Sequence, residues 1–79
     1  MTTDWIKLFV IDRVSMSETM RKNAASDLEN GYSISQITRQ MVAIEEYEKE
    51  TDRMYVEFTK SPTGQEKAHR YLKKVGAIV

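Results

Sequence analysis

The longest pattern in the sequence is a mostly apolar stripe over residues 34–58. Its side chains recur at alternating steps of three and four residues, the spacing of one face of an α-helix, and Glu48 is the one polar interruption. Ser33 and Gln36 form a capping-box pair immediately before the stripe. The pattern predicts a helix over residues 33–60, about 42 Å long at about 1.5 Å per residue.

Such a helix is longer than a compact protein of 79 residues is wide. Its stripe therefore needs a second chain, a bend or an external partner to cover it. We expect a homodimer in which two copies bury the stripe. The predicted dimer core consists of Ile34, Ile37, Met41, Ile44, Tyr55 and Phe58.

Two further helices are predicted on either side of the long one. Residues 65–75 place apolar side chains on one side and basic side chains on the other, and Gly76 follows as a cap. Earlier in the chain, the run Ser15-Met16-Ser17-Glu18 offers a second capping box. Met16, Met20, Ala24 and Leu28 then recur at steps of four. We expect a helix to begin at this run and to pack on the long helix.

Residues 5–14 form an apolar run rich in β-branched and aromatic types, which suits either a strand or a helix. A strand would have no partner elsewhere in the chain and would have to pair across a dimer. We favour a helix that begins at Thr3 or Asp4. The predicted fold is a single all-α domain over residues 1–79, a bundle of three to four helices dominated by the one over 33–60.

Composition limits the classes of function. The chain has no cysteine and only isolated glycines, which excludes a disulfide framework, a thiolate zinc site, a cysteine nucleophile and a glycine-rich phosphate loop. A content of 41% hydrophobic and 30% charged residues is typical of a folded, soluble module. The sequence shows neither a basic leader nor an apolar stretch of the about 20 residues that cross a bilayer. We expect a cytoplasmic protein, in the host cytoplasm if viral, without membrane contact.

The one imidazole is His69, and Glu66 precedes it at the spacing of metal ligands in di-iron helical bundles. Both residues belong to the polar face of their predicted helix, whereas bundle ligands project into the core. The sequence has no serine in a nucleophile elbow and no pair of carboxylates in an apolar setting. We therefore expect no catalytic site, no bound metal and no cofactor.

Charge is distributed unevenly along the chain. Residues 32–59 carry three basic and six acidic groups (net −3), and residues 60–79 carry five basic and one acidic (net +4). The acidic run over 45–52 has three interpretations: a solvated helix face, a docking site for the basic 67–74 helix of the same or a second chain, or a surface that competes for a basic site on another protein. Aromatic residues and methionine are enriched at interfaces. The predicted partner-binding residues are Glu45, Glu46, Tyr47, Glu50 and Met54.

Residues 29–41, which contain the run Gly-Tyr-Ser-Ile-Ser-Gln, resemble the turn and second-helix start of ribbon-helix-helix DNA-binding proteins. The resemblance implies a dimer, an intermolecular strand within 5–14 and a first helix over 17–28. Residues 1–59 are net −4, however, whereas a DNA-binding domain needs a positive face. A nucleic-acid-binding regulator would contact phosphates through basic residues that lie mostly in the last third of the chain. These candidates are Arg39, Lys60, Lys67, Arg70, Lys73 and Lys74.

Binding without catalysis is the favoured prediction for function. A small, cysteine-free chain with a long half-covered helix and a polarised charge pattern suits an inhibitor or adaptor of a larger protein. Mobile elements and phages often encode small proteins of this kind. The alternative is the dimeric nucleic-acid-binding transcriptional regulator described above.

Overall fold

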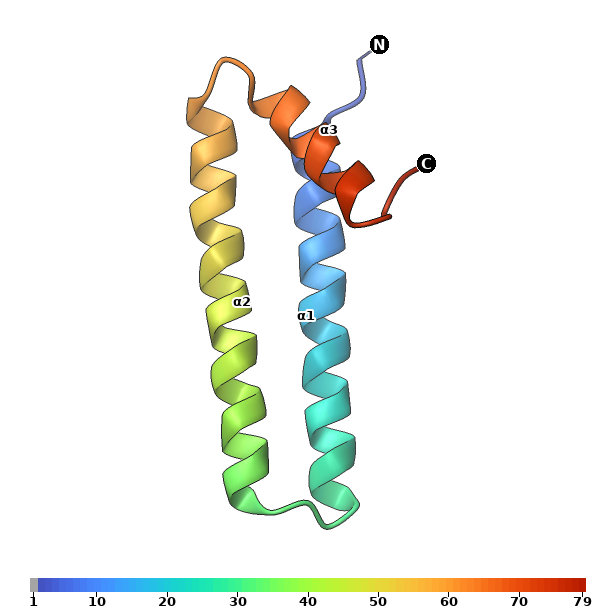
Figure 1. Ribbon diagram of the computed structural model, residues 1–79, viewed down its shortest axis with the longest axis vertical. Coiled ribbons are helices and arrows are strands. Elements are labelled where there is room, and N and C mark those ends of the chain that lie inside the picture. The colour runs from blue at the N-terminus through green and yellow to red at the C-terminus, as the bar shows by residue number, and fades with distance from the viewer. Residues whose placement is uncertain (1) are drawn as a thin grey trace.

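Two antiparallel helices of similar length form the body of the protein, and a short third helix packs across one end of the pair (Figure 1). In this computed structural model, which describes residues 2–79, α1 spans Trp5–Glu29, α2 spans Ile34–Lys60 and α3 spans Gly64–Lys74. The described residues contain no strand, so the all-α class is confirmed and the ribbon of a ribbon-helix-helix protein is not present among them. The body is a hairpin of two long helices, of 25 and 27 residues, and not the expected single dominant helix.

The predicted start of α2 and the predicted end of α3 are confirmed, the latter to within one residue. The hydroxyl of Ser33 accepts the backbone N–H of Gln36, whose side chain accepts the backbone N–H of Ser33 in return. Gly31, in the turn before this cap, and Gly76, after the last turn of α3, have φ angles of +87° and +78°. Both glycines adopt the left-handed conformation that other residues rarely reach, which explains why the chain turns there.

The prediction that a helix begins at Ser15–Glu18 is wrong, because α1 continues through these residues without a break. The cap of α1 is Asp4, whose carboxylate accepts a backbone N–H of the first turn. Inside the helix, the hydroxyl of Thr19 donates to the carbonyl of Ser15 at 3.1 Å. A capping box is a local signal, whereas packing against the other helices decides where a helix of a folded protein ends.

The predicted apolar face of α1 is right only in its middle. Ala24 is buried and Met20 is half-buried, as predicted, but Met16 and Leu28 are about half exposed. The polar residues Arg13 and Ser17 are buried instead. The buried row therefore includes two polar residues. Hydrophobic periodicity cannot reveal a helix face of this kind, because it counts only apolar side chains.

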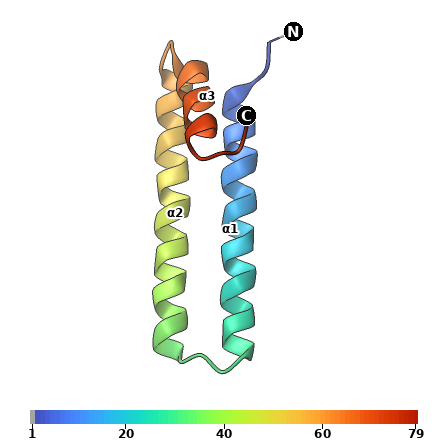
Figure 2. The same ribbon diagram turned by 45° about the vertical axis from the view of Figure 1, so that its right-hand side comes forward.

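The main core lies at the end of the hairpin that α3 covers, where α3 packs against both long helices and is seen between them in Figure 2. Phe9 of α1 and Leu72 of α3 are fully buried there. The ring of Phe9 meets Phe58 and Tyr71 edge to face, with centroid distances of 5.0 and 5.2 Å. Full burial of a side chain such as Phe9 contributes about 1.5–3 kcal/mol, so this end holds much of the stability of the fold.

The backbone at the start of α3 lies very close to the backbone of the last turns of α2. Gly64 is buried, and a Cβ atom at this position would lie 1.7 Å from the carbonyl oxygen of Phe58. Only glycine can open α3 at this distance from the last turns of α2.

The far end of the hairpin has two helices and little core. Its buried apolar residues are Ala24 and Ile44. The molecule measures 48 × 23 × 18 Å, and its radius of gyration of 15.2 Å exceeds the about 12 Å of a compact domain of this length. The accessible surface of 5908 Å² is roughly 1,000 Å² larger than that of a compact 9.2 kDa protein.

Candidate functional site

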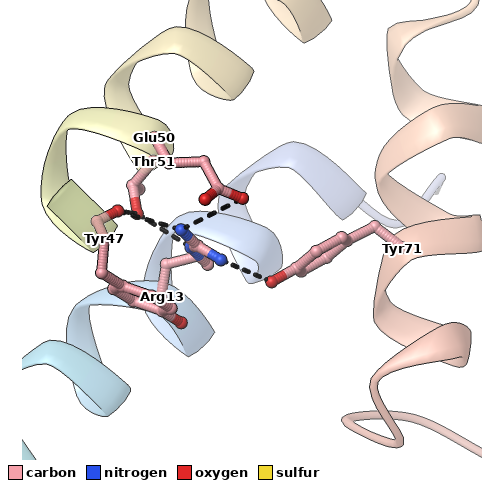
Figure 3. Close-up of polar contacts among 5 residues, drawn as sticks. All are labelled: Arg13, Tyr47, Glu50, Thr51 and Tyr71. Atoms are coloured by element: carbon pink, nitrogen blue, oxygen red, sulfur yellow. Dashed lines mark hydrogen bonds and ion pairs between the residues drawn. The ribbon is translucent and has the colours of Figure 1, made fainter. Parts of the chain in front are cut away.

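A buried arginine joins the three helices at the edge of the main core (Figure 3). Arg13 of α1 is 4% exposed. Its Nε donates to the hydroxyl of Thr51 at 2.8 Å, and one Nη donates to the backbone carbonyl of Tyr47 at 2.9 Å, both on α2. The other Nη donates to the hydroxyl of Tyr71 on α3 at 2.8 Å. All three donating nitrogens are therefore directed at groups within the chain.

The charge of this guanidinium is balanced mainly by dipoles and an aromatic ring. The Cζ atom of Arg13 lies 3.5 Å from the ring centroid of Tyr47. The nearest carboxylate is that of Glu50, at 3.9 Å and 54% exposed. Burial raises the pKa of the Tyr47 phenol, which keeps this ring neutral next to the cation. The arrangement suits a structural junction, because a ligand would have to displace these internal partners.

A polar ladder continues along the hairpin one turn away. Glu48 of α2 accepts a hydrogen bond from Ser17 and two from Arg21, at 2.6 and 3.1 Å. The bonds from Arg21 and, next, from Ser17 hold the pKa of the Glu48 carboxyl below its usual value. This pairing explains why Glu48 interrupts the apolar stripe. Beside it, a shallow hollow of about 230 Å³ opens between α1 and α2.

The residues predicted to bind a partner divide into two groups. Glu45, Glu46 and Glu50 are exposed. Tyr47 and Met54 are half-buried, since Tyr47 stacks on Arg13 and Met54 packs against the main core. The accessible part of this predicted site is thus the acidic one.

The basic candidates for nucleic-acid contact lie mainly at the end of the molecule that carries α3. Arg70, Lys73 and Lys74 are exposed on α3, as is Lys60 at the end of α2. Lys67 forms an ion pair with Glu57 at 3.7 Å. The sixth candidate, Arg39, is exposed in the half of α2 nearer the hairpin turn, so the six do not form one surface.

The residues predicted to form a dimer core differ in exposure. Ile44 and Phe58 are buried within the single chain. Ile37 and Met41 are half-buried, and Ile34 and Tyr55 are 73% and 42% exposed. The intramolecular hairpin therefore covers part of the stripe and leaves the rest on its surface.

The lone histidine lies where the start of α1 meets α3. The ring of His69 stacks on that of Trp5 with centroids 4.2 Å apart. Gln65 donates to Asp4 and accepts the backbone N–H of Trp5, and the bond from Gln65 contributes most to lowering the pKa of Asp4. Among residues 2–79, no three histidine, cysteine, aspartate or glutamate side chains lie close enough together to hold a metal ion, so Glu66 and His69 have no third ligand within that range.

Sequence reasoning missed the junction at Arg13 and the ladder at Ser17. One signal was present: Phe9, Arg13 and Ser17 follow one another at steps of four and share one helix face. No known family model, curated protein or solved structure matches the chain. No helix within residues 2–79 is both long and apolar enough to span a membrane.

Proposed function

We propose that the protein is a non-enzymatic protein-binding module that works as a homodimer and acts as an inhibitor or adaptor of a larger protein. The observation that carries this proposal is the excess exposed surface of the hairpin, roughly 1,000 Å² above that of a compact protein of its mass. A standard protein–protein interface covers about 800 Å² on each partner. The hairpin therefore presents as much spare surface as each subunit of the proposed homodimer would bury.

The acidic side chains of α2 supply a chemistry for the larger partner. Glu46 and Glu50 lie one helical turn apart and are 63% and 54% exposed. The nearest internal cations are Lys49, at 3.8 Å from Glu46, and the buried Arg13, at 3.9 Å from Glu50. The exposed Glu46–Lys49 pair contributes about 0–1 kcal/mol, which leaves the Glu46 carboxylate free to meet a basic surface.

Capture from a host lysate, with and without nuclease, tests this proposal. We expect a stoichiometric protein partner that survives nuclease and is lost from the Glu46→Lys variant. The matched control is Glu29→Lys, which makes the same charge change at an exposed residue at the end of α1. Equal loss from both variants would count against the acidic surface. Tyr47→Ala is a poor probe, because its ring packs on the buried Arg13.

A second candidate function is supported by the exposed cations of α3. Arg70, Lys73 and Lys74 lie on the polar side of a helix whose apolar side is buried, so they could contact phosphates without any change of fold. Anisotropy measurements with a labelled oligonucleotide test this function. Each cation that contacts a phosphate should lower the slope of log affinity against log salt by about 1 when it is replaced by glutamine. Capture that is abolished by nuclease would favour this function over the first.

A further inference from the structure

The face of the hairpin opposite α3 is uncovered along its length. On α1, Trp5 stacks on α3, whereas Val10 and Val14 lie on the other side of the helix. There the seam between α1 and α2 opens in two hollows, one beside Val14 and Arg21 and one beside Val10 and Tyr55. We call this side of the hairpin the open face.

The open face is apolar at both ends and charged in the middle. The apolar band level with α3 contains Val14 and Tyr55, which are 47% and 42% exposed. The apolar band near the hairpin turn contains Leu28 and Ile34, which are 48% and 73% exposed, together with the half-buried Ile37 and Met41. Between the two bands lie Glu18, Arg21, Glu45, Glu48 and Asp52.

Residues on α1 and α2 that belong to one band lie at the same height along the hairpin. Val10 and Tyr55 line one hollow, and Arg21 reaches Glu48 at 2.6 Å. A rotation about an axis parallel to the helices keeps these heights unchanged. It therefore brings each band of one copy to the same band of another.

We propose that a second copy of this chain packs on the open face about a two-fold axis parallel to the helices, so that α1 of each copy lies against α2 of the other. Apolar bands then meet apolar bands, and Arg21 lies level with the partner's Glu45. All neighbouring helices in the resulting four-helix arrangement are antiparallel, as in up-and-down bundles. Both copies of α3 lie on the outside at the same end.

The charges argue against the opposite orientation. Glu45 and Asp52 lie about one turn below and one turn above Glu48 on α2. If the second copy were inverted end to end, Glu45 of each copy would come to the height of Asp52 in the other. That would place like charges together at the centre of an interface, which is unfavourable.

Two observations favour a second copy of the chain as the partner on the open face: the surplus surface area and the arrangement of the bands. The roughly 1,000 Å² of surplus surface matches what each subunit of a standard dimer buries, about 800 Å². An isologous contact also requires a surface that complements itself, which the two apolar bands provide. This inference rests on the proposed homodimer and is independent of the larger partner, because Glu46 lies about a third of a turn round α2 from Glu45, away from the open face.

Sedimentation equilibrium of the purified chain tests the second copy. We expect twice the 9.2 kDa chain mass, and an at least tenfold weaker dimer for Val14→Lys combined with Ile34→Lys. Val42→Lys is the matched control, since Val42 is 55% exposed on the outer side of α2 and should leave the dimer unchanged. A chain that stays monomeric at about 100 µM, or a dimer weakened only by the control, would overturn the inference. Neither result bears on the capture of the larger protein in the lysate experiment, which tests the acidic surface separately.

A distance between spin labels tests the axis without disturbing the interface. The chain has no cysteine, so Ser35→Cys in the otherwise unchanged protein gives one label per copy beside the hairpin turn. With helix spacings of about 8–10 Å, the proposed dimer holds the two labels within about 30 Å of each other. Inverted copies would separate them by nearly the 48 Å length of the molecule, and that result would overturn the proposed arrangement.

Discussion

Replacement of Arg13 tests whether the buried guanidinium holds the three helices together. Arg13→Ala removes the hydrogen bonds to Thr51, Tyr47 and Tyr71. Thr51 keeps its own bond to the carbonyl of Tyr47 at 2.9 Å, so the hydroxyl of Tyr71 is the group left without this partner. That loss costs about 1–3 kcal/mol, and the lost stacking on Tyr47 costs about 0.5–2 kcal/mol more. We expect the free energy of unfolding to fall by about 2–4 kcal/mol.

Arg13→Met combined with Tyr71→Phe separates charge from packing. Methionine fills most of the volume and has no charge to desolvate, and phenylalanine removes the hydroxyl that would otherwise lose its partner. Buried polar partners that are replaced together by apolar groups often cause no loss of stability, so we expect this double variant to cost less than about 1.5 kcal/mol. Arg53→Ala, which removes an exposed arginine of α2, is the control and should stay within about 0.5 kcal/mol of the unchanged protein.

Urea unfolding followed by circular dichroism at one fixed protein concentration measures these differences, because dimerisation would otherwise alter the apparent stability. With a slope of about 1 kcal/mol per molar urea, Arg13→Ala should lower the midpoint by about 2 M or more. An alanine variant as stable as the Arg53→Ala control would refute the junction. Equal losses for Arg13→Ala and for the Arg13→Met, Tyr71→Phe double variant would refute the argument that desolvation offsets the polar contacts.

Further predictions concern the glycines and the titrating groups. Gly64→Ala should lower the free energy of unfolding by more than about 3 kcal/mol, because its Cβ would meet the backbone of α2. Gly31→Ala has open space around its Cβ but a positive φ, so it should lower the free energy of unfolding by only about 1–2 kcal/mol. Equal losses in thermal or urea unfolding would refute the close approach at Gly64. Because Arg21 lowers the pKa of Glu48, this carboxylate contributes to stability above pH 4.5, its ordinary pKa, and the contribution is lost as the pH falls through the lowered pKa. Glu48→Gln should therefore reduce the decrease of the urea midpoint at acidic pH. An unchanged pH profile would contradict the assignment. Because burial raises the pKa of Tyr47, stability should fall as the pH rises from 10 through the raised pKa. Tyr47→Phe should reduce this fall in urea midpoints, and the same fall in both proteins would refute the assignment.

The sequence predicted α2 well because several signals agree there. The cap at Ser33, the apolar period and the break before Pro62 all mark one helix, and the hairpin packs on part of that face. It predicted α1 poorly because its inner face carries Arg13 and Ser17, whose partners come from elsewhere in the chain. A buried polar residue is recognised only when those partners are known.

The candidate site was predictable in its exposed part only. The carboxylates at 45, 46 and 50 lie on the surface, as the acidic run indicated. Tyr47 and Met54 looked like recognition residues for the same compositional reason, yet the fold uses them against Arg13 and the main core. Aromatic residues and methionine suit a core as well as an interface, so the pattern alone could not decide between the two.

The placement of α3 gives the molecule a gradient of local stability. Backbone amides near Phe9 and Leu72 lie in a three-helix core and should exchange with solvent only on global unfolding. Amides toward the turn at Gly31 depend on two helices whose buried apolar residues are Ala24 and Ile44, so fraying from the turn can expose them while the rest stays folded. The uncovered half of the hairpin is thus also the half that can adapt its shape to what it binds, and slower exchange there would report binding directly.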